Sequence, residues 1–587
     1  MEDKNFFCLN GRSQSDVPGK ITFFASTGQS TVDYVWVNDC CLTLVEDFMV
    51  DIISTRSDHF PVSALLATSS IGSSVLASEA PVVYRVAWDY GRRVQFTESL
   101  MLSDNIKFDF GVLSIDQQSD NFKLAIIDTA TKVHMIKKSG GPPASSSHPP
   151  NKPWYDADCI ELKRELDSSL HNFKQVGFLR EFGANYLNLK KKYANLIKLK
   201  KKLYAEELLN CLANVQSSKD FWLTIKKFRP FTTSASQISL DDWYSFYLQI
   251  TPSKVPSNIS FPSFTDPLLD SQVSHNELLC NILKLKNGKA AGPDEISNEF
   301  FKHLPPNWIL YLETHFNKIL EAERVPNSWG SAALTMIFKK GDKLDPLNYR
   351  GIALCNCLTK LFTQILRDRI QQWADREKIL DESQAGFRPG RGCLDQVFVL
   401  FDAIRLQLRL GSRKVFSVFV DFRRAFDSVP HDKLWSKLLN LHLSPKIVKI
   451  LKSLYDGANI RVKAGGLLSG EVPVTAGVLQ GESLSPLLFI LFITDLEKYL
   501  RNCGFHGVNI NGRDDVLLLL YADDLVILTD SECKLQRILD ALHRYCLGNG
   551  LTGNSDKTKV MVFRESGSLS PSPKFLYNNR LLEIVPL

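Results

Sequence analysis

Three aspartates stand where a carboxylate is unusual. Asp421 follows the run VFSVFV, whose β-branched and aromatic residues predict a buried strand ending at this acid. Asp523 and Asp524 lie between two apolar runs, VLLLLY and LVIL, which predict a hairpin with the acids at its tip. Because burying unpaired anions is strongly unfavourable, this arrangement favours a bound cation. Mg²⁺ suits one or two carboxylates completed by substrate phosphates.

An ordinary turn is the alternative explanation for the acidic pair. Aspartate is common in turns, so Asp523 and Asp524 alone would indicate an exposed loop. Asp421 at the end of a second strand favours the metal site, since two strand ends can bring their carboxylates together.

The surrounding segments predict an α+β architecture. After Ser274, helical patterns alternate with short β-branched strands. Ser485 followed by Pro486 predicts an N-cap and the first turn of a helix that extends toward Leu500. Gly481, just before this helix, allows a close approach of the backbone to a ligand.

Two segments rich in Pro and Ser, Lys137–Pro153 and Thr251–Pro267, predict linkers. Between them the pattern from Trp154 to Phe228 is helical. Residues 151–230 contain 16 Lys and Arg against 9 Asp and Glu, and seven lysines lie between Lys190 and Lys202. This basic amphipathic helix suits a nucleic-acid backbone, but a solvated helix face explains it equally well.

Composition excludes several classes of protein. The 587 residues carry 70 Lys and Arg against 64 Asp and Glu, and 44% are hydrophobic, as in globular multidomain chains. No apolar run approaches the ~20 residues of a membrane span, so no membrane partner is expected. Residues Met1–Asn10 show no secretion signal, which predicts an intracellular protein. Twelve scattered cysteines predict reduced thiols rather than disulfides or a zinc site.

At these residues the sequence resembles a known family. YADD in a hairpin, preceded by DFRRAFDSVPH, resembles the palm of reverse transcriptases from non-LTR (LINE-type) retrotransposons. Further segments resemble the family in the expected order, namely Gly288–Ile296, Val325–Phe362, Gln384–Gln396, Gly477–Leu496 and Leu551–Phe563. Two positions depart from the family pattern, with Glu295 where glycine is usual and Gly553 where an aliphatic residue is usual.

The resemblance implies the palm and fingers of a right-hand polymerase that copies an RNA template into DNA from a DNA primer, using dNTPs. Two Mg²⁺ ions are expected, and Mn²⁺ could replace them. Asp421 and Asp523 would hold both ions with the backbone carbonyl of Phe422, and Asp524 would help to shape the metal site. Lys557 would protonate the departing pyrophosphate.

The resemblance also implies a set of substrate-binding residues. Cations suit the triphosphate, because phosphate recognition uses charge-assisted donors. A bulky Phe426 would clash with a ribose 2′-hydroxyl and select dNTPs, although a core phenylalanine is the alternative. Gln480 and Gly481 would lie near the template–nucleotide pair. The implied substrate-binding residues are Lys339, Lys340, Arg350, Phe426, Gln480 and Gly481.

A second resemblance lies near the N-terminus. TVDYVWV from Thr31 and SDHFPV from Ser57 resemble the C-terminal end of an apurinic-type endonuclease with the endonuclease/exonuclease/phosphatase fold. His59 would contact the scissile phosphate, Asp33 would orient its imidazole, and Asp58 would lie near a metal. The earlier metal-binding part of that fold does not fit in about 30 residues, so we predict no nicking activity.

These patterns divide the chain into 1–66 (endonuclease-like), 67–153 (connector and linker), 154–250 (basic helical connector) and 275–587 (fingers and palm without a thumb). Target DNA is a further expected partner, and the nucleus and cytoplasm are the expected location. The alternative is a catalytically inactive, truncated or domesticated remnant that still binds nucleic acid. An intron-type maturase is disfavoured by the SDH segment.

Overall fold

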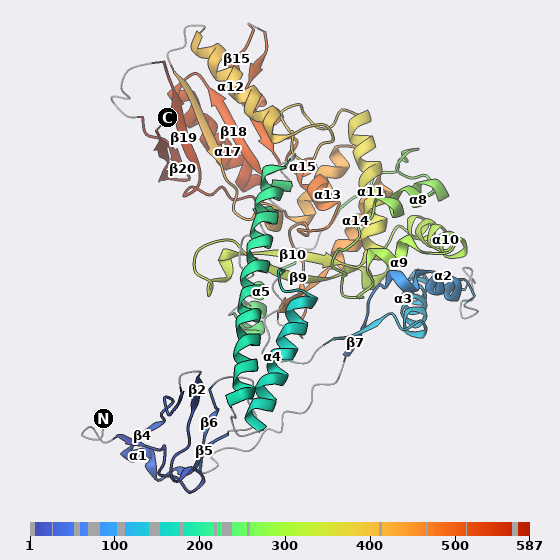
Figure 1. Ribbon diagram of the computed structural model, residues 1–587. Helices are drawn as coiled ribbons and strands as arrows, with labels where there is room; N and C mark the ends of the chain where they lie inside the picture. The colour runs from blue at the N-terminus through green and yellow to red at the C-terminus, as the bar shows by residue number, and fades with distance from the viewer. Residues whose placement is uncertain are drawn as a thin grey trace. The chain divides into compact units, whose positions relative to one another are not determined.

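The chain divides into two compact units. The computed structural model describes all residues except 1–5, 26–27, 52–58, 68–82, 103–111, 140–152, 176–179, 216–219, 222–223, 226–237, 255–258, 410–413, 465–466, 512, 566–572 and 587. Unit 1 comprises Met1–Val82 and Gly140–Thr233, and unit 2 comprises Val83–Ser139 and Ser234–Leu587 (Figure 1).

Unit 1 begins with short antiparallel strands around a small core. The longest pair joins β5 (Val45–Val50) to β6 (Val62–Leu66), and the core contains Leu9, Phe48 and Phe60. The other elements of this part are β1 (Phe6–Cys8), η2 (Gln14–Asp16), β2 (Phe23–Ala25), β3 (Gly28–Ser30), β4 (Trp36–Asn38) and α1 (Asp39–Leu42).

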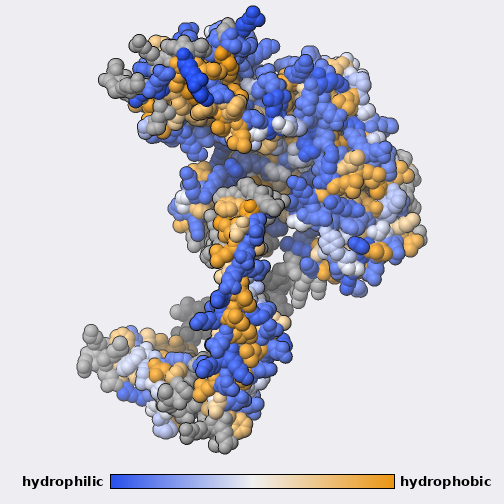
Figure 2. All heavy atoms as spheres, turned by 45° about the horizontal axis from the view of Figure 1, so that its top comes forward, coloured by the Kyte–Doolittle hydropathy of each residue, from blue (hydrophilic) through white to orange (hydrophobic). Residues whose placement is uncertain are grey.

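The rest of unit 1 is an antiparallel pair of helices, α4 (Ala157–Gln175) and α5 (Arg180–Ala213). Leu166, Leu170 and Tyr186 belong to the core between them, and Figure 2 shows hydrophobic and hydrophilic side chains in adjacent stripes along this pair. The predicted basic helix is therefore present in α5. Its charge is partly neutralised, because Lys200 pairs with Asp156 and Asp158 and Lys202 pairs with Glu206.

Unit 2 contains most of the helices. In chain order they are η3 (Tyr90–Arg92), α2 (Arg93–Met101), α3 (Ile115–Lys132), α7 (Leu240–Ile250), α8 (His275–Lys284), α9 (Asn298–Lys302), α10 (Pro306–Ala322), η4 (Asn327–Gly330), η5 (Pro346–Asn348), α11 (Cys357–Arg376), α12 (Cys393–Arg409), η6 (Phe426–Ser428), α13 (His431–Asn440), α14 (Pro445–Asp456), α15 (Ser485–Ile493), α16 (Leu496–Asn502) and α17 (Glu532–Asn549).

Its strands form two main sheets and several short pairs. In chain order they are β7 (Val83–Val86), β8 (Ile136–Ser139), β9 (Ser331–Phe338), β10 (Tyr349–Cys355), β11 (Val415–Val420), β12 (Asn459–Ala464), β13 (Leu467–Leu468), β14 (Val472–Pro473), β15 (Val508–Asn509), β16 (Asp515–Val516), β17 (Leu518–Tyr521), β18 (Asp524–Thr529), β19 (Lys559–Phe563), β20 (Leu576–Tyr577), β21 (Arg580–Leu581) and β22 (Glu583–Val585).

The central sheet has the strand order β17-β18-β11-β19-β22. The predicted hairpin of β17 and β18 is present, and the predicted strand β11 lies between β18 and β19. Val420 pairs with Leu525, and Leu525 pairs with Leu520. This register places Asp421, the next residue after β11, beside the tip of the hairpin.

Successive side chains of the central sheet point to opposite faces, and helices cover both of these faces. Val418 and Val420 face a large core shared with α13, α14, α15 and α17. Val415, one residue out of phase with these two, faces a smaller core beneath α12. Both faces of β11 are thus buried, as its uninterrupted apolar sequence predicts.

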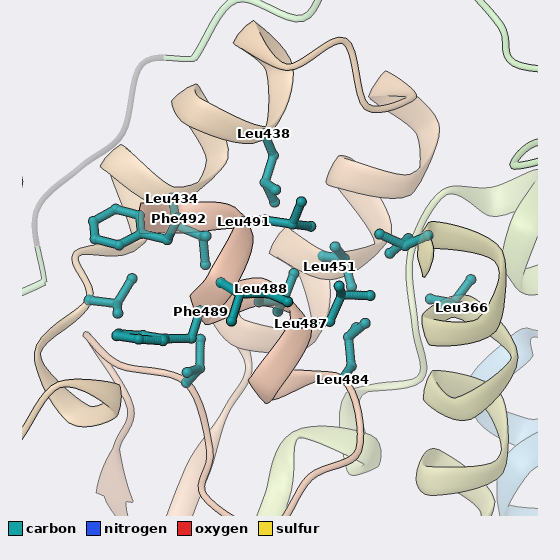
Figure 3. Close-up of a cluster of buried hydrophobic side chains, with 14 of the residues drawn as sticks. Leu366, Leu434, Leu438, Leu451, Leu484, Leu487, Leu488, Phe489, Leu491 and Phe492 are labelled. Carbon is teal, nitrogen blue, oxygen red and sulfur yellow. The ribbon is translucent and has the colours of Figure 1, made fainter. Parts of the chain in front are cut away.

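Helix α15 lies inside the large core. Eight of its nine residues are buried, and Figure 3 shows its leucine and phenylalanine side chains directed toward neighbouring helices on several sides. The expected helix from Pro486 to Leu500 is wrong in one respect, since it is divided into α15 and α16 at Thr494 and Asp495. Ser485 is also not the N-cap, because it is the first residue of α15 and Leu484 holds the N-cap position. The Glu482 carboxylate accepts hydrogen bonds from the backbone N–H groups of Ser485 (3.0 Å) and Leu484 (2.7 Å).

The second sheet positions one wall of the site. β9 pairs with β10 antiparallel and with β12 parallel. Trp243 of α7 is fully buried against this sheet, with its ring 5.2 Å from that of Tyr349.

Residues 83–139 group with unit 2, although the sequence suggested a connector there. Phe96 of α2 and Phe122 of α3 belong to the large core, which explains this grouping. Residues 137–139, expected at the start of a linker, belong to strand β8, which pairs with β7. No helix in the described part of the chain is long and apolar enough to cross a membrane.

Candidate active site

A cleft of about 1000 Å³ opens beside the end of β11 in unit 2. Its walls come from the turn after β11, the β17–β18 hairpin, strand β10 and the loop before α15. The predicted site residues that line it are Lys339, Arg350, Asp421, Phe422, Phe426, Gln480, Gly481, Asp523 and Lys557. Lys340 and Asp524 do not line it.

Asp421 is held from two sides. Its backbone carbonyl accepts a hydrogen bond from the Asn554 backbone N–H (2.7 Å), and its Oδ2 accepts one from Asn554 Nδ2 (2.9 Å). Lys557 Nζ lies 3.5 Å from the same Oδ2. The loop before β19 thus fixes this carboxylate, although no role for Asn554 was expected from the sequence. The only hint in the sequence was that Asn554 lies three residues before Lys557, a predicted site residue.

Asp523 lies at the hairpin tip, where desolvation raises the pKa of its carboxyl and the negative charges of Asp524 and Asp421 raise it further. A cation at this point would relieve that repulsion, and carboxylate oxygens suit a hard divalent ion. Asp524 is exposed at the start of β18. Among the described residues, no three acidic, His or Cys side chains are close enough to enclose a metal.

One wall of the cleft is basic. Burial lowers the pKa of Lys339, and the neighbouring charges of Arg350 and Lys557 lower it further, so these cations lie close enough to repel one another. Such a group favours a polyanionic ligand. Arg424 adds a cation that was not expected from the sequence, with its guanidinium 5.4 Å from the centre of the Phe246 ring.

Asp427 was also not expected in the site, although it lies within the stretch that begins at Asp421. Desolvation by the cleft walls raises its pKa, and the charges of Arg424, Lys339 and Arg350 act against that shift. Its Oδ1 accepts a hydrogen bond from Gln480 Nε2 (3.3 Å). Asp427 is therefore the acid that faces the basic wall and orients Gln480.

Two phenylalanines of the β11 turn differ in their surroundings. Phe422 is 5% exposed and its ring packs in the large core. Phe426 lines the cleft, with one side of its ring stacked on Phe489 at 4.7 Å and its edge toward Phe387 at 6.3 Å. These contacts fix the ring at the cleft surface.

Gly481 has a positive φ of 108°. A Cβ at this position would lie 2.7 Å from the carbonyl oxygen of Ala353. The close neighbour in this structure is therefore strand β10, where Ala353 N donates a hydrogen bond of 2.6 Å to the carbonyl of Gln480. The loop before α15 is fixed to the basic wall by this contact.

In unit 1, Asp33 and His59 are in contact. His59 Nδ1 lies 2.8 Å from Asp33 Oδ2, and the Phe23 ring packs 4.7 Å from the imidazole. Asp58 lies outside the described residues. The structure therefore brings together the two residues that the sequence paired, and both are accessible to solvent.

Residues 337–577, which include the cleft acids and the central-sheet strands β11, β17, β18 and β19, match the family described as reverse transcriptase (RNA-dependent DNA polymerase). The chain contains a reverse transcriptase domain. Its mixed helices and sheets fit a polymerase fold, as expected from the α+β pattern.

Several proteins are similar to the reverse transcriptase domain and its surroundings. A probable RNA-directed DNA polymerase from transposon BS of Drosophila melanogaster is 31% identical over 360 residues, which cover 60% of this chain and 36% of that protein. The RNA-directed DNA polymerase from mobile element jockey of Drosophila funebris is 31% identical over 310 residues (51% and 32%). The chain thus spans about a third of the length of these curated relatives.

Two further proteins are similar to the chain at lower sequence identity. A Pol polyprotein from the type-1 retrotransposable element R2 of Popillia japonica is 27% identical over 247 residues, covering 42% of this chain and 34% of that protein. A structure of apo telomerase from Candida tropicalis, truncated from the C-terminal domain, aligns over 83% of this chain and 84% of that one, with 13% identity. Its TM-score of 0.33 is too low to identify the fold.

Proposed function

We propose that the protein is an RNA-directed DNA polymerase that serves target-primed reverse transcription of a non-LTR retrotransposon. The observation that carries this proposal is the cleft, whose lining brings together the acids Asp421 and Asp523 and the cations Lys339 and Arg350. Carboxylates beside a cluster of cations suit a nucleotide with its triphosphate. The relatives named as RNA-directed DNA polymerases support the same reaction.

Asp421 and Asp523 would hold two Mg²⁺ ions, with the backbone carbonyl of Phe422 as a further donor and Asp524 shaping the site; Mn²⁺ could substitute. When bound, such ions stabilise the attacking and leaving oxygens of an in-line phosphoryl displacement. Lys557 lies beside Asp421, where its ammonium could protonate pyrophosphate as it leaves.

The remaining residues of the cleft select and hold the substrates. Lys339 and Arg350 bind the triphosphate through charge-assisted hydrogen bonds. The fixed ring of Phe426 excludes a ribose 2′-hydroxyl, which favours dNTPs. Gln480, oriented by Asp427, contacts the pair formed by the RNA template and the incoming nucleotide. An RNA template, a DNA primer in the target DNA and a nuclear site of action follow from this function.

Primer extension on an RNA template tests this function. We expect Mg²⁺-dependent incorporation of dNTPs by the wild type and a loss of about 10³-fold or more in Asp523→Ala, because the reaction depends on this carboxylate. Asp540→Ala is the matched control, since Asp540 is an exposed acid on α17 that bonds only Gln536 among described side chains. Its activity should equal that of the wild type.

Equal background incorporation by wild type and Asp523→Ala would contradict the polymerase proposal. The chain would then be the alternative, an inactive protein that retains nucleic-acid binding. Fluorescence polarisation with a labelled RNA–DNA duplex separates the two possibilities, because binding without extension supports only the alternative. The exposed lysines of α5, such as Lys191 and Lys192, are the first candidates for such binding.

We also propose that the strands at the start of unit 1 are related to the C-terminal end of an apurinic-type endonuclease. The 2.8 Å contact of Asp33 with His59 supports this, because a carboxylate fixes the tautomer of a catalytic imidazole. We still expect no nicking of supercoiled plasmid. Mg²⁺-dependent nicking by the wild type that is lost in His59→Ala would contradict this expectation.

A further inference from the structure

The side chain of Gln384 is bound to the tip of the β17–β18 hairpin. Gln384 is 3% exposed. Its Oε1 accepts hydrogen bonds from the backbone N–H groups of Ala522 (3.0 Å) and Gly386 (2.8 Å), and its Nε2 donates to the Ala522 carbonyl (3.3 Å). One amide therefore satisfies both backbone polar groups of the residue that precedes Asp523.

Ala522 needs such support. Its φ of 60° lies in the left-handed region, which is unfavourable for a residue with a side chain. The tip carries the adjacent acids Asp523 and Asp524 directly after this residue. A fixed Ala522 therefore fixes the backbone from which the Asp523 side chain extends.

The segment around Gln384 approaches the hairpin so closely that nothing else can occupy the space. Ala385 N donates to the Leu520 carbonyl (2.9 Å), and Leu520 N donates to the Ser383 carbonyl (2.8 Å). A Cβ on Gly386 would lie 2.1 Å from the backbone nitrogen of Ala522. The segment thus acts as an additional strand along the outer edge of β17.

We propose that Gln384 is a positioning residue that holds Asp523 in its metal-binding place through Ala522. This inference rests on the proposed polymerase function for the identity of the ligand. Groups that orient a metal ligand set the affinity for the metal, and their loss typically costs 10–100-fold in that affinity. Gln384 does not line the cleft, so nucleotide binding by Lys339 and Arg350 of the basic wall should depend much less on it.

Gln396 provides a matched control. Its Nε2 donates to the carbonyls of Ser383 (2.8 Å) and Leu520 (3.2 Å), so it binds the same segment and the same strand. It makes these contacts away from Ala522. Loss of Gln396 should therefore affect stability in a similar way without changing the position of Asp523.

The experiment measures Mn²⁺ binding to the purified full chain by electron paramagnetic resonance. The Asp523→Ala variant measures how much Mn²⁺ binds at sites that do not involve Asp523. We expect Gln384→Met to raise the dissociation constant about tenfold and Gln396→Met to leave it within twofold. Gln384→Glu keeps an acceptor for Ala522 N–H, and its value should lie between those of wild type and Gln384→Met. In primer extension, the half-saturating metal concentration should rise while the KM for dNTP stays within twofold.

Equal Mn²⁺ affinities of Gln384→Met and Gln396→Met would overturn the proposal, as would wild-type binding no tighter than that of Asp523→Ala. If the Gln384→Met protein does not fold, Gln384→Glu is compared with the wild type instead. An unchanged Mn²⁺ affinity of Gln384→Glu would also overturn the proposal. Because the binding measurement needs no turnover, wild-type chain that binds Mn²⁺ tightly but extends no primer would contradict the polymerase proposal and leave this one standing.

Discussion

Lys557 Nζ lies 3.5 Å from Asp421 Oδ2, so a cation of the protein already occupies the vicinity of a carboxylate that would bind metal. The Lys557 side chain is 67% exposed and Asp421 is 36% exposed, which makes this a solvent-screened pair. Its contribution is below about 1 kcal/mol. The pair is therefore weak enough to open when a metal or pyrophosphate arrives.

Replacement of Lys557 separates its two possible effects. We expect Lys557→Met to lower the half-saturating Mg²⁺ concentration by at most about fivefold, because a weak competing cation is removed. Its turnover should fall by about 10²-fold if the ammonium protonates pyrophosphate. Lys557→Arg is the control, since it keeps the charge but does not release a proton, and it should lose turnover without gaining metal affinity. Normal turnover in both variants, measured by primer extension, would remove Lys557 from the chemistry.

Phe426→Val should weaken the selection of dNTPs over rNTPs by about tenfold, because a smaller side chain leaves room for the 2′-hydroxyl. The variant should also lose about 1 kcal/mol of stability with the stacking contact to Phe489. Single-nucleotide incorporation measures the selectivity. Leu347→Ala is the control, since this exposed side chain lines the same cleft. If both variants retain wild-type selectivity, Phe426 serves only in packing.

Asp294 makes stability depend on pH. Burial raises its pKa to about 6 from 3.8, so folding favours the neutral acid. The stability it contributes is complete below about pH 3.8 and is lost as the pH rises through 6. Asp294→Asn keeps an acceptor for Ile296 N–H and should stabilise unit 2 by about 3 kcal/mol at pH 8 and by about half as much at pH 5. Urea unfolding at both pH values measures this, and an equal effect at the two would contradict it.

Gly481→Ala should destabilise the chain by more than about 3 kcal/mol, because its Cβ would meet the Ala353 carbonyl oxygen and its φ is positive. Gly504 is the matched control. It has a φ of 80° and no atom within 4 Å of the position that a Cβ would take, so Gly504→Ala should cost only about 1 kcal/mol. Thermal unfolding compares the two, and similar losses would show that only backbone conformation matters at Gly481.

The parts of the site that sequence patterns predict are those fixed by local periodicity. The uninterrupted apolar run before Asp421 predicts a strand covered on both faces, and β11 has this property. The two apolar runs around Asp523 predict the hairpin, and its register follows from the shortness of the turn. Strand ends and turn tips are positions that the period-2 pattern locates directly.

Contacts between distant segments were beyond the reach of such patterns. Gln384 binds Ala522 across 138 residues of sequence, and nothing in a glutamine indicates which backbone it will meet. Ser485 is the first residue of α15 and not its N-cap, and the Glu482 carboxylate accepts from two N–H groups at the start of this helix, a contact that the Ser-Pro pattern does not indicate. Asp427 shows the same limit, since two of the cations around it, Lys339 and Arg350, come from a distant part of the sequence.

The strand order of the central sheet has a consequence for biosynthesis. β11 is made before both of its neighbours, β18 and β19, which follow more than 100 residues later. At roughly 5–20 residues per second, a ribosome needs at least several seconds to complete them. During that interval, the nascent apolar strand has no hydrogen-bonding partner in its final sheet, and chaperones that bind extended hydrophobic segments should contact it there.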